Sequence, residues 1–429
     1  KLDHQRPLIV GVLPHTSCAP SLPGCGFCTF PHESFQASRV RATAGAVGQE
    51  IQRLREAQPE LARRRVEALY FGGGTANLTP SDTLEELCQT LAQTFPLDEA
   101  EVTLEGAPAF FLTRNGQSLE VLKRTLPTSR LRISLGIQSF DPAQLQSMGR
   151  QALGDRTVVE RVVNMASARG FTTSGDFLIN LPGQSLEEML RDARQAVNMG
   201  LDQICLYHLV LFRGLGTPWS RDRSKLEQIP NLDQAQFHWG EVRQFLLSRG
   251  YVQASLTNFE RLDVHLSQRR YIYEDCSFHP EAYDAVGFGP AALSTFTDLP
   301  GRMALKTMNE PLAEDYAKHT QSPVRRRFLY GEKDLKLLYL TRKLSRLSAA
   351  RRPYTRAYGG DPVEDFPEEF AALQKAGLLE VTADSLRLTT DGMFYADAVA
   401  GLLASRRIRE LRLGQGPGDP NASLAFPMG

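Results

Sequence analysis

Short runs of apolar and β-branched residues recur along the first half of the chain, and each has the length of a β-strand. Between them, apolar residues return every three or four positions, as Val47, Ile51 and Leu54 do, which is the spacing of an amphipathic helix. Strands that alternate with helices become parallel neighbours joined by crossovers, so the pattern predicts an α/β barrel or an open sheet. The predicted strands cover residues 8–13, 68–71, 101–104, 131–137, 173–179 and 203–209.

Polar or glycine-rich residues follow each predicted strand directly, in the segments PHTSC, GGGT, EGAP, QSFD and NLPGQ. In both a barrel and an open parallel sheet, the active site lies at the carboxyl ends of the strands. We therefore expect these segments to meet and to form the site.

The pattern changes in the last quarter of the chain. A length of 429 residues exceeds one compact domain. We expect residues 1–300 to form a catalytic barrel with a C-terminal extension. Residues 321–408, where a helix precedes two short strands around a turn, are predicted to form a small winged-helix-like module. Residues 409–429 are rich in glycine and proline and are expected to be a flexible tail.

Charge and hydropathy narrow the set of partners. Lysine plus arginine equals aspartate plus glutamate at 49 each, so the net charge provides no general attraction to nucleic acid or to anionic membranes. The basic run Arg325, Arg326 and Arg327 is too local for a nucleic-acid footprint. No stretch approaches the roughly 20 apolar residues of a membrane span. We expect a cytoplasmic protein without a membrane or nucleic-acid partner.

Three of the six cysteines, Cys18, Cys25 and Cys28, lie in one loop directly after the first predicted strand. This crowding is unlike the distributed framework of a secreted disulfide protein. Three thiolates on a four-iron cluster leave one iron open for a cofactor. The alternative is a zinc site, because His15 and His32 flank the cysteines and zinc accepts three cysteines and one histidine.

A glycine run, Gly72 to Gly74, and then Thr75 follow the second predicted strand. Backbone without side chains approaches a ligand closely and offers its polar groups to it. A glycine run alone indicates only a turn, but beside a cysteine loop it favours a cofactor that carries an amino-acid group.

The cysteine loop and the glycine run together resemble the radical S-adenosylmethionine (SAM) superfamily. YFGGGTANL, TLEGAP, RISLGIQSFD, DFLINLPGQS, ICLYHLVLFRGLGTP and AVGFGPAALS extend the resemblance to the subfamily of oxygen-independent coproporphyrinogen III dehydrogenase, the related heme chaperone and a group of radical methyltransferases. The resemblance implies a partial (β/α)6 barrel followed by a C-terminal winged-helix-like domain.

The same resemblance assigns roles to individual residues. Cys18, Cys25 and Cys28 would hold a [4Fe-4S] cluster, and Phe27 would lie against the adenine of SAM. The remaining residues predicted to bind SAM are Gly72, Gly73, Gly74, Thr75, Glu105, Gln138, Arg150 and Asp176. Singly, each polar side chain is as readily a cap or a solvated group, and Phe27 as readily packs in its loop.

Departures from the family motifs favour the methyltransferase branch. Six residues separate the first two cysteines, where the subfamily has three. The His-Asn and Tyr-Trp motif of heme chaperones is absent, and Leu293 stands where their histidine is expected. Thr29, Phe30 and Pro31 follow Cys28, where the porphyrinogen enzyme has a further cysteine.

The leading hypothesis is therefore a C-methyltransferase that uses two SAM molecules to methylate or cyclopropanate an sp2 carbon of a natural-product or peptide-derived substrate. Such an enzyme also needs a reductant such as flavodoxin or ferredoxin. Tyr273, Glu274 and His279, in the divergent segment before the last glycine motif, are the candidate acid/base residues, and Cys276 is a weaker one. The alternative for this segment is an ordinary loop, and for His208 a core position.

Three rival hypotheses remain. A heme chaperone would keep the cluster and bind heme without methyl transfer, and a coproporphyrinogen decarboxylase ranks below it. An inactive barrel whose winged module binds a peptide or nucleic acid is disfavoured by the retained cysteines and by GGGT and GIQSF.

Overall fold

The computed structural model describes residues 3–319 and 321–413. A single sheet of 12 strands runs through the barrel in the order β14-β13-β12-β11-β1-β4-β5-β6-β7-β8-β10-β9. The parallel strands β1, β4, β5, β6, β7 and β8 are the six runs that the sequence predicted, and the partial (β/α)6 barrel is confirmed. Their bounds are β1 Leu8–Val12, β4 Val66–Phe71, β5 Glu101–Gly106, β6 Leu131–Gln138, β7 Thr172–Ile179 and β8 Gln203–His208.

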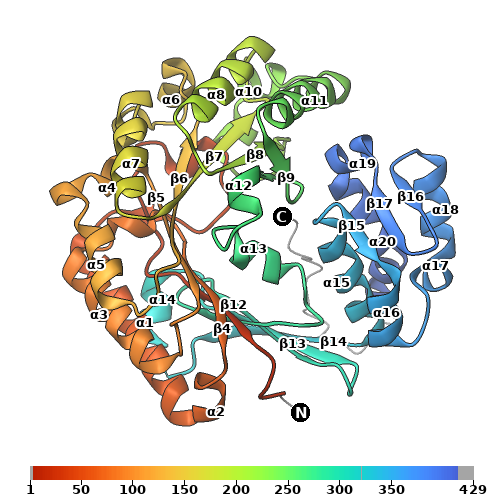
Figure 1. Cartoon of the computed structure of the whole chain (residues 1–429), viewed down its shortest axis with the longest axis horizontal. Helices are drawn as coiled ribbons and strands as arrows, with labels where there is room; N and C mark the ends of the chain where they lie inside the picture. Colours follow the sequence, from red (N-terminus) through yellow and green to blue (C-terminus); the bar gives the residue numbers. More distant parts are fainter. Residues whose placement is uncertain (1–2, 320, 414–429) are drawn as a thin grey trace.

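Amphipathic helices cover the outer face of this sheet (Figure 1). Alternate strand residues such as Val10, Leu69 and Ile133 point outward and pack with the apolar faces of the helices in one core. Val47 of α1 and Leu84 of α3 belong to this core, at the spacing the sequence showed. The main covering helices are α1 Ala37–Ala57, α3 Ser81–Thr94, α5 Gln117–Thr125, α7 Arg156–Ala168 and α8 Leu186–Asn198.

The inner face of the barrel is polar, and a short helix fills part of it. Helix α13 (Ile272–Ser277) lies against this face, where Ile272 and Cys276 pack on Ile9 of β1 and Ala68 of β4. Arg132 of β6 is fully buried below it and donates from Nε to Gln203 Oε1 at 2.7 Å. The segment after β8 thus folds back into the barrel and closes its amino-terminal half.

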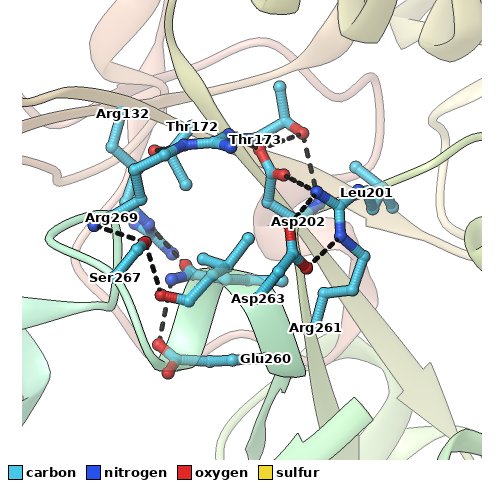
Figure 2. Close-up of polar contacts among 12 residues, drawn as sticks. Arg132, Thr172, Thr173, Leu201, Asp202, Glu260, Arg261, Asp263, Ser267 and Arg269 are labelled. Carbon is cyan, nitrogen blue, oxygen red and sulfur yellow. Dashed lines mark hydrogen bonds and ion pairs between the residues drawn. The ribbon is translucent and has the colours of Figure 1, made fainter. Parts of the chain in front are cut away.

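An ion-pair cluster fastens that segment at the amino ends of β7 and β8 (Figure 2). Asp202 accepts a hydrogen bond from Thr173 N at 2.9 Å and pairs with Arg269. It also faces Arg261 at 3.4 Å, and Arg261 pairs in turn with Asp263 at 2.6 Å. Arg261 ends β10 (Asn258–Arg261), the antiparallel neighbour of β8, so the cluster joins the bottom of the barrel to its edge. The outermost strand on that side is β9 (Tyr251–Gln253).

Beyond β1, the sheet continues through β11 (Asp284–Phe288), β12 (Leu293–Asp298), β13 (Met303–Asn309) and β14 (Val324–Tyr330). The sequence analysis assigned residues 321–331 to the C-terminal module, but β14 is the edge strand of the large sheet. The three consecutive arginines of this strand are all exposed, so the segment lacks the apolar alternation that would have indicated a strand.

The C-terminal module has its own core, in which Leu335, Tyr339, Phe370 and Leu386 are buried. It contains the predicted helix and hairpin as α18 (Pro367–Lys375), β16 (Leu379–Val381) and β17 (Ser385–Leu388), and β15 (Ser348–Ala350) pairs with β17. The other helices are α15 Glu332–Leu344, α16 Arg351–Tyr358, α17 Pro362–Asp365, α19 Thr390–Phe394 and α20 Ala396–Arg412.

The predicted tail begins inside α20, because residues 409–412 are helical. Residues 414–429 lie outside the described residues. In the described part of the chain, no helix has both the length and the apolar character that crossing a membrane requires.

Candidate active site at the carboxyl ends of the barrel strands

The three cysteines of the loop after β1 are neighbours in space. Cys18 ends β2 (Ser17–Cys18), and Cys25 sits in a tight turn with a φ of 52°. Burial, and then the negative charges of Cys25 and Cys28, raise the pKa of the Cys18 thiol to about 12. Thiols in such surroundings ionise when a cationic group binds them, since a metal deprotonates a coordinating thiol outright. The donor set fits a cluster held by Cys18, Cys25 and Cys28.

Neither flanking histidine completes a zinc site with these cysteines. His15 is buried and accepts a hydrogen bond at Nδ1 from Ser17 N at 3.2 Å. His32 Nδ1 lies 2.9 Å from the carbonyl of Phe30. Within residues 3–319 and 321–413, no group of three or more His, Cys, Asp or Glu side chains is arranged to hold a single metal ion. The ligand arrangement therefore gives the zinc alternative no support.

Arg150 connects the cysteine loop to the barrel. Its Nη1 donates to Cys25 Sγ at 3.3 Å, and its Nη2 donates to the carbonyl of Gly136 on β6. The side chain is buried, and its Nε has no hydrogen-bond partner in the part of the chain that the structure describes. Arg150 was predicted to bind SAM, and the structure places it beside Cys25 with one N–H available to an acceptor.

The glycine run brings β4 against the cysteine loop. A Cβ on Gly74 would lie 2.5 Å from the carbonyl oxygen of Ser17, and one on Gly73 would lie 2.9 Å from that of His15. Gly73 also has a φ of 122°, which side chains disfavour. Thr75 N donates to Ser17 O at 2.9 Å. These contacts give the glycines a role in packing that the sequence analysis did not foresee, beside the predicted contact with SAM.

Two carboxylates face the interior of the barrel. Glu105 on β5 accepts a hydrogen bond from Tyr70 Oη at 3.1 Å, and Asp176 on β7 accepts one from Ser134 Oγ at 3.2 Å. Burial, followed by the charge of Asp176, raises the pKa of Glu105 to about 7. Burial raises the pKa of Asp176 as well. The two predicted site carboxylates therefore lie close together and share one polar interior.

Gln138 ends β6 in a strained backbone conformation with a φ of 70°, at a break in the register with β7. A Cβ on Gly136 would lie 3.4 Å from both Gln138 Nε2 and Arg150 Nη2. A non-glycine residue in the left-handed region is uncommon and is often found at functional sites. Gln138 and Arg150 therefore converge beside the same strand end, as the sequence predicted.

Phe27 packs on a residue that the sequence analysis missed. The rings of Phe27 and Trp219 lie 5.6 Å apart between centroids. Trp219 fits so closely over Gly26 that a Cβ there would lie 2.2 Å from the indole. It is the second residue of the short helix α9 (Pro218–Arg221) and directly follows the motif that ends in GTP, which is the signal that could have identified it. The packing role of Phe27 is present, and its contact with adenine stays a prediction.

The three predicted acid/base residues do not come together. Tyr273 and Glu274 lie on α13 inside the barrel, where the Tyr273 ring is 5.1 Å from that of Tyr70 and Glu274 accepts from Ser255 Oγ at 3.1 Å. Burial raises the pKa of Glu274 to about 7. His279 lies beyond the end of α13, at the C-terminal module. There its Nε2 is 2.9 Å from Arg346 Nη1, and Lys343 contacts its Nδ1.

This placement corrects the prediction for His279. Helix α13 ends at Ser277, so the chain has left the barrel before it reaches His279. The histidine is held as a structural contact, which is the alternative that the sequence left open for this segment. Cys276, the weaker candidate, is buried among Ile9, Ala68 and Ile272.

A second missed group stands at the carboxyl ends of β7 and β8. Asn180 is fully buried with a φ of 60°. Its Nδ2 lies 3.0 Å from His208 Nδ1, and its Oδ1 lies 2.9 Å from His238 Nδ1. His208 also packs on Phe394 of the C-terminal module, at 5.0 Å between centroids. The segment NLPGQ pointed to this strand end, but nothing in the sequence singled out His238 on α11 (Leu232–Ser248).

Comparison with known proteins agrees with this geometry. Residues 22–196 match the model of the Radical SAM superfamily. They span the last two cysteines, the glycine run, Glu105, Gln138, Arg150 and Asp176. The matched part of the chain is a radical SAM domain, in agreement with the fold and the site. This match implies a [4Fe-4S] cluster and SAM as cofactors.

Among radical SAM proteins, the chain is similar to heme chaperones and coproporphyrinogen III oxidases. It is 23% identical to the heme chaperone HemW of Haemophilus influenzae over 361 residues, 82% of this chain and 86% of that protein. It is 29% identical to the mouse mitochondrial radical S-adenosyl methionine domain-containing protein 1 over 54% of this chain, a match that spans only 50% of the mouse protein. The solved coproporphyrinogen III oxidase HemN of Escherichia coli shares the fold, with a TM-score of 0.77, 20% identity, and coverage of 94% of this chain and 91% of that one.

These findings overturn the predicted methyltransferase function. The curated relatives include heme chaperones and oxygen-independent coproporphyrinogen III oxidases, which were the alternatives in the sequence analysis. The departures that favoured methyl transfer, including Leu293 and the wider cysteine spacing, do not outweigh these matches. The use of two SAM molecules was implied only by the methyltransferase hypothesis, so nothing supports it now.

Proposed function

We propose that this protein is a heme-chaperone-like radical SAM protein, which cleaves SAM at its cluster and binds a tetrapyrrole of the heme class. The observation that carries the proposal is the set of three neighbouring thiols beside Arg150 at the carboxyl ends of the barrel strands. The likeness to HemW, which extends over most of both chains, supports the tetrapyrrole as ligand.

The residues after the last cysteine favour chaperone-like binding over decarboxylation of coproporphyrinogen. Thr29, Phe30 and Pro31 follow Cys28, so this chain lacks the further cysteine that the sequence analysis associated with the porphyrinogen enzyme. Phe30 N instead donates a hydrogen bond to Cys28 Sγ at 3.4 Å. In this chain, a backbone hydrogen bond to Cys28 therefore holds the loop where the porphyrinogen enzyme is expected to have its further cysteine.

The protein's own residues position and shield the site. When bound, the cluster and SAM supply the one-electron chemistry of the superfamily. Arg150 holds Cys25 in place and keeps its Nε ready for a carboxylate or carbonyl acceptor. Trp219 packs over Gly26 and shields the Cys25 side of the cysteine loop. Below the site, Glu105 exchanges a proton near neutral pH, because its pKa is raised to about 7 by burial and by Asp176.

The electron would come from a small redox protein such as flavodoxin or ferredoxin. Cys18 and Cys28 are only partly buried, so a cluster on them would lie near the surface. A peptide substrate, considered with the methyltransferase, is not part of this proposal. One SAM molecule is sufficient for it.

The experiment combines two measurements on the anaerobically reconstituted full chain. With SAM and dithionite, we expect 5′-deoxyadenosine by mass spectrometry, and we expect it to be lost in Cys18→Ala. With hemin, we expect a shifted Soret band that saturates at a defined stoichiometry. Failure of wild-type protein to bind hemin would refute the proposal, and conversion of coproporphyrinogen III would replace it by the decarboxylase function.

A further inference from the structure

A groove of about 790 Å3 lies outside the barrel, between α1 and the outer face of β11 to β14. Small-molecule sites commonly have volumes of about 300–1,000 Å3. The groove is separate from the cluster site, because the two lie on opposite faces of the sheet. Ala285 of β11 points to the inner face and packs with α13, whereas its neighbour Val286 lines the groove.

The strand register gives the sheet wall an apolar row beside a polar one. Leu305 of β13 is paired with Phe296 of β12 and with Leu329 of β14, so the three side chains form one row across the sheet. Ser294, Thr307 and Arg327 form the adjacent row in the same way. All six line the groove.

Apolar side chains in this groove are unusually open to solvent. Leu305 is 38% exposed, Leu329 47% and Met303 41%. When an apolar row faces a cavity instead of packing against a helix, it is often part of a ligand site. Met303 adds a thioether, which is one of the donors that heme iron accepts.

The opposite wall is one face of α1, formed by Glu50, Arg53, Leu54 and Ala57 at helical spacing. Glu50 is already engaged. It accepts hydrogen bonds from Tyr316 Oη at 2.5 Å, from Gly289 N at 2.9 Å and from Asn309 Nδ2 at 2.9 Å. Asp298, at one end of the groove, is also engaged and accepts from Gly301 N at 3.1 Å.

The two arginines of the groove retain unused donors. Arg53 Nη2 is buried and has no hydrogen-bond partner among the residues that the structure describes. Arg327, on the opposite wall, makes no ion pair with a described residue. A buried guanidinium donor without an acceptor is costly, and a carboxylate ligand would relieve that cost.

We propose that this groove binds the tetrapyrrole, with the macrocycle on the row of Phe296, Leu305 and Leu329 and its carboxylates on Arg53 and Arg327. Two cations on opposite walls match a broad apolar body with more than one carboxylate, whereas a fatty acid has only one. The choice of a tetrapyrrole rests on the proposed function. The location of the groove rests on the structure alone.

Titration of the full chain with hemin, followed by its Soret absorbance, tests whether the tetrapyrrole binds in the groove. We expect Arg53→Gln and Arg327→Gln each to weaken hemin binding about tenfold, the effect of losing one charged hydrogen bond. Arg326→Gln is the matched control, because strand alternation places Arg326 on the other face of β14. Leu305→Asp should also weaken hemin binding, because it places a charge in the apolar row. Leu305 is already 38% exposed, so we expect this variant to fold. Formation of 5′-deoxyadenosine should stay unchanged in all four variants.

The outcomes separate this inference from the proposed function. Hemin binding that persists in Cys18→Ala and weakens in the groove variants supports the groove. Hemin binding by wild-type protein that none of the groove variants alters would overturn the groove alone. Displacement of hemin by equimolar laurate would also overturn it, by assigning the groove to fatty acids. Absence of hemin binding in wild-type protein would remove the proposed function itself.

Discussion

At the scale of single residues, Arg150 is the side chain that connects the barrel to the cysteine loop most directly. It is the side chain that donates to Cys25 Sγ, and its second bond fixes it to β6. Arginine presents several donors in a fixed plane, so neither lysine nor an amide reproduces both bonds.

We predict that Arg150→Gln lowers formation of 5′-deoxyadenosine by at least about tenfold, the loss of one charged hydrogen bond. Iron content after reconstitution should remain at the wild-type value, because Cys18, Cys25 and Cys28 are unchanged. Arg161→Gln, on the exposed face of α7, is the control. Wild-type activity in Arg150→Gln would show that the bond to Cys25 has no functional role.

Glu105 gives the stability of the protein a pH dependence. Its pKa is raised by burial to about 7 from an ordinary 4.5, so the folded protein holds a proton that the unfolded chain releases between these values. The contribution to stability is therefore fully present below pH 4.5 and is lost as the pH rises to 7, by roughly 3 kcal/mol at most.

We predict that Glu105→Gln, which cannot ionise, flattens this dependence. The urea midpoint of wild-type protein should fall more between pH 5 and pH 7.5 than that of the variant. The stability of the variant should still depend partly on pH, because burial also raises the pKa of Glu274 to about 7. Equal slopes in wild-type protein and variant would contradict the elevated pKa of Glu105.

At the scale of elements, the Asp202 cluster explains how β10, α12 (Leu262–His265) and α13 stay attached to the barrel. Asp202 is buried and serves Thr173, Arg261 and Arg269, whereas Asp263 at the other end of the cluster is exposed (Figure 2). The arginine partners of Asp202 are partly exposed, so its removal costs mainly the hydrogen bonds that the buried carboxylate accepts, about 1–3 kcal/mol. Exposed pairs contribute at most about 1 kcal/mol.

We therefore predict that Asp202→Asn lowers the thermal midpoint by several degrees, while Asp263→Asn leaves it almost unchanged. Differential scanning calorimetry on both variants measures the contrast. Similar midpoints for the two variants would show that the cluster is not the anchor of this segment.

Much of the barrel could be predicted because its strands are buried between helices and a closed interior. Such strands read as nearly continuous apolar runs, as in LIVGV of β1 and LRISLGIQ of β6. The residues Glu105, Gln138 and Asp176 on these strands were assigned from the family resemblance of their motifs. Local patterns do not report which segment fills the interior, so the place of α13, and with it that of His279, came only from the structure.

Other site residues had no local signal. His238 lies on an amphipathic helix where any polar residue fits, and its contact with Asn180 joins positions far apart in the sequence. Trp219 follows a recognisable motif but contacts Gly26 across the site. The function was predicted wrongly because single-residue departures such as Leu293 were given more importance than the likeness of the whole chain.

At the scale of the whole molecule, the C-terminal module contacts the barrel at several places, two of which involve the candidate site residues His279 and His208. His279 meets Lys343 and Arg346 of the module on one side. On the other, Phe394 packs on His208, and Gln236 of α11 donates to Asp391 at 2.6 Å. Two distant contacts hold the module in one orientation.

We predict that His279→Ala reduces stability without a direct effect on SAM cleavage, because His279 lies at the module and not beside the cysteines. Limited proteolysis should cut the variant faster than wild-type protein, while the rate of 5′-deoxyadenosine formation at low temperature stays within about twofold. His319→Ala, an exposed histidine that bonds within its own helix, is the control. Abolished SAM cleavage in folded His279→Ala would restore its predicted catalytic role.

The basic run Arg325, Arg326 and Arg327 acquires a meaning from the position of β14. This strand is an outer edge of the 12-stranded sheet, so its free backbone groups are a template on which another chain could add a strand. A second molecule that approached edge to edge would bring this basic strand against its own copy, and Arg327 against Arg327. Such like-charge contacts disfavour self-association of a sheet whose edge strand also carries the exposed Leu329.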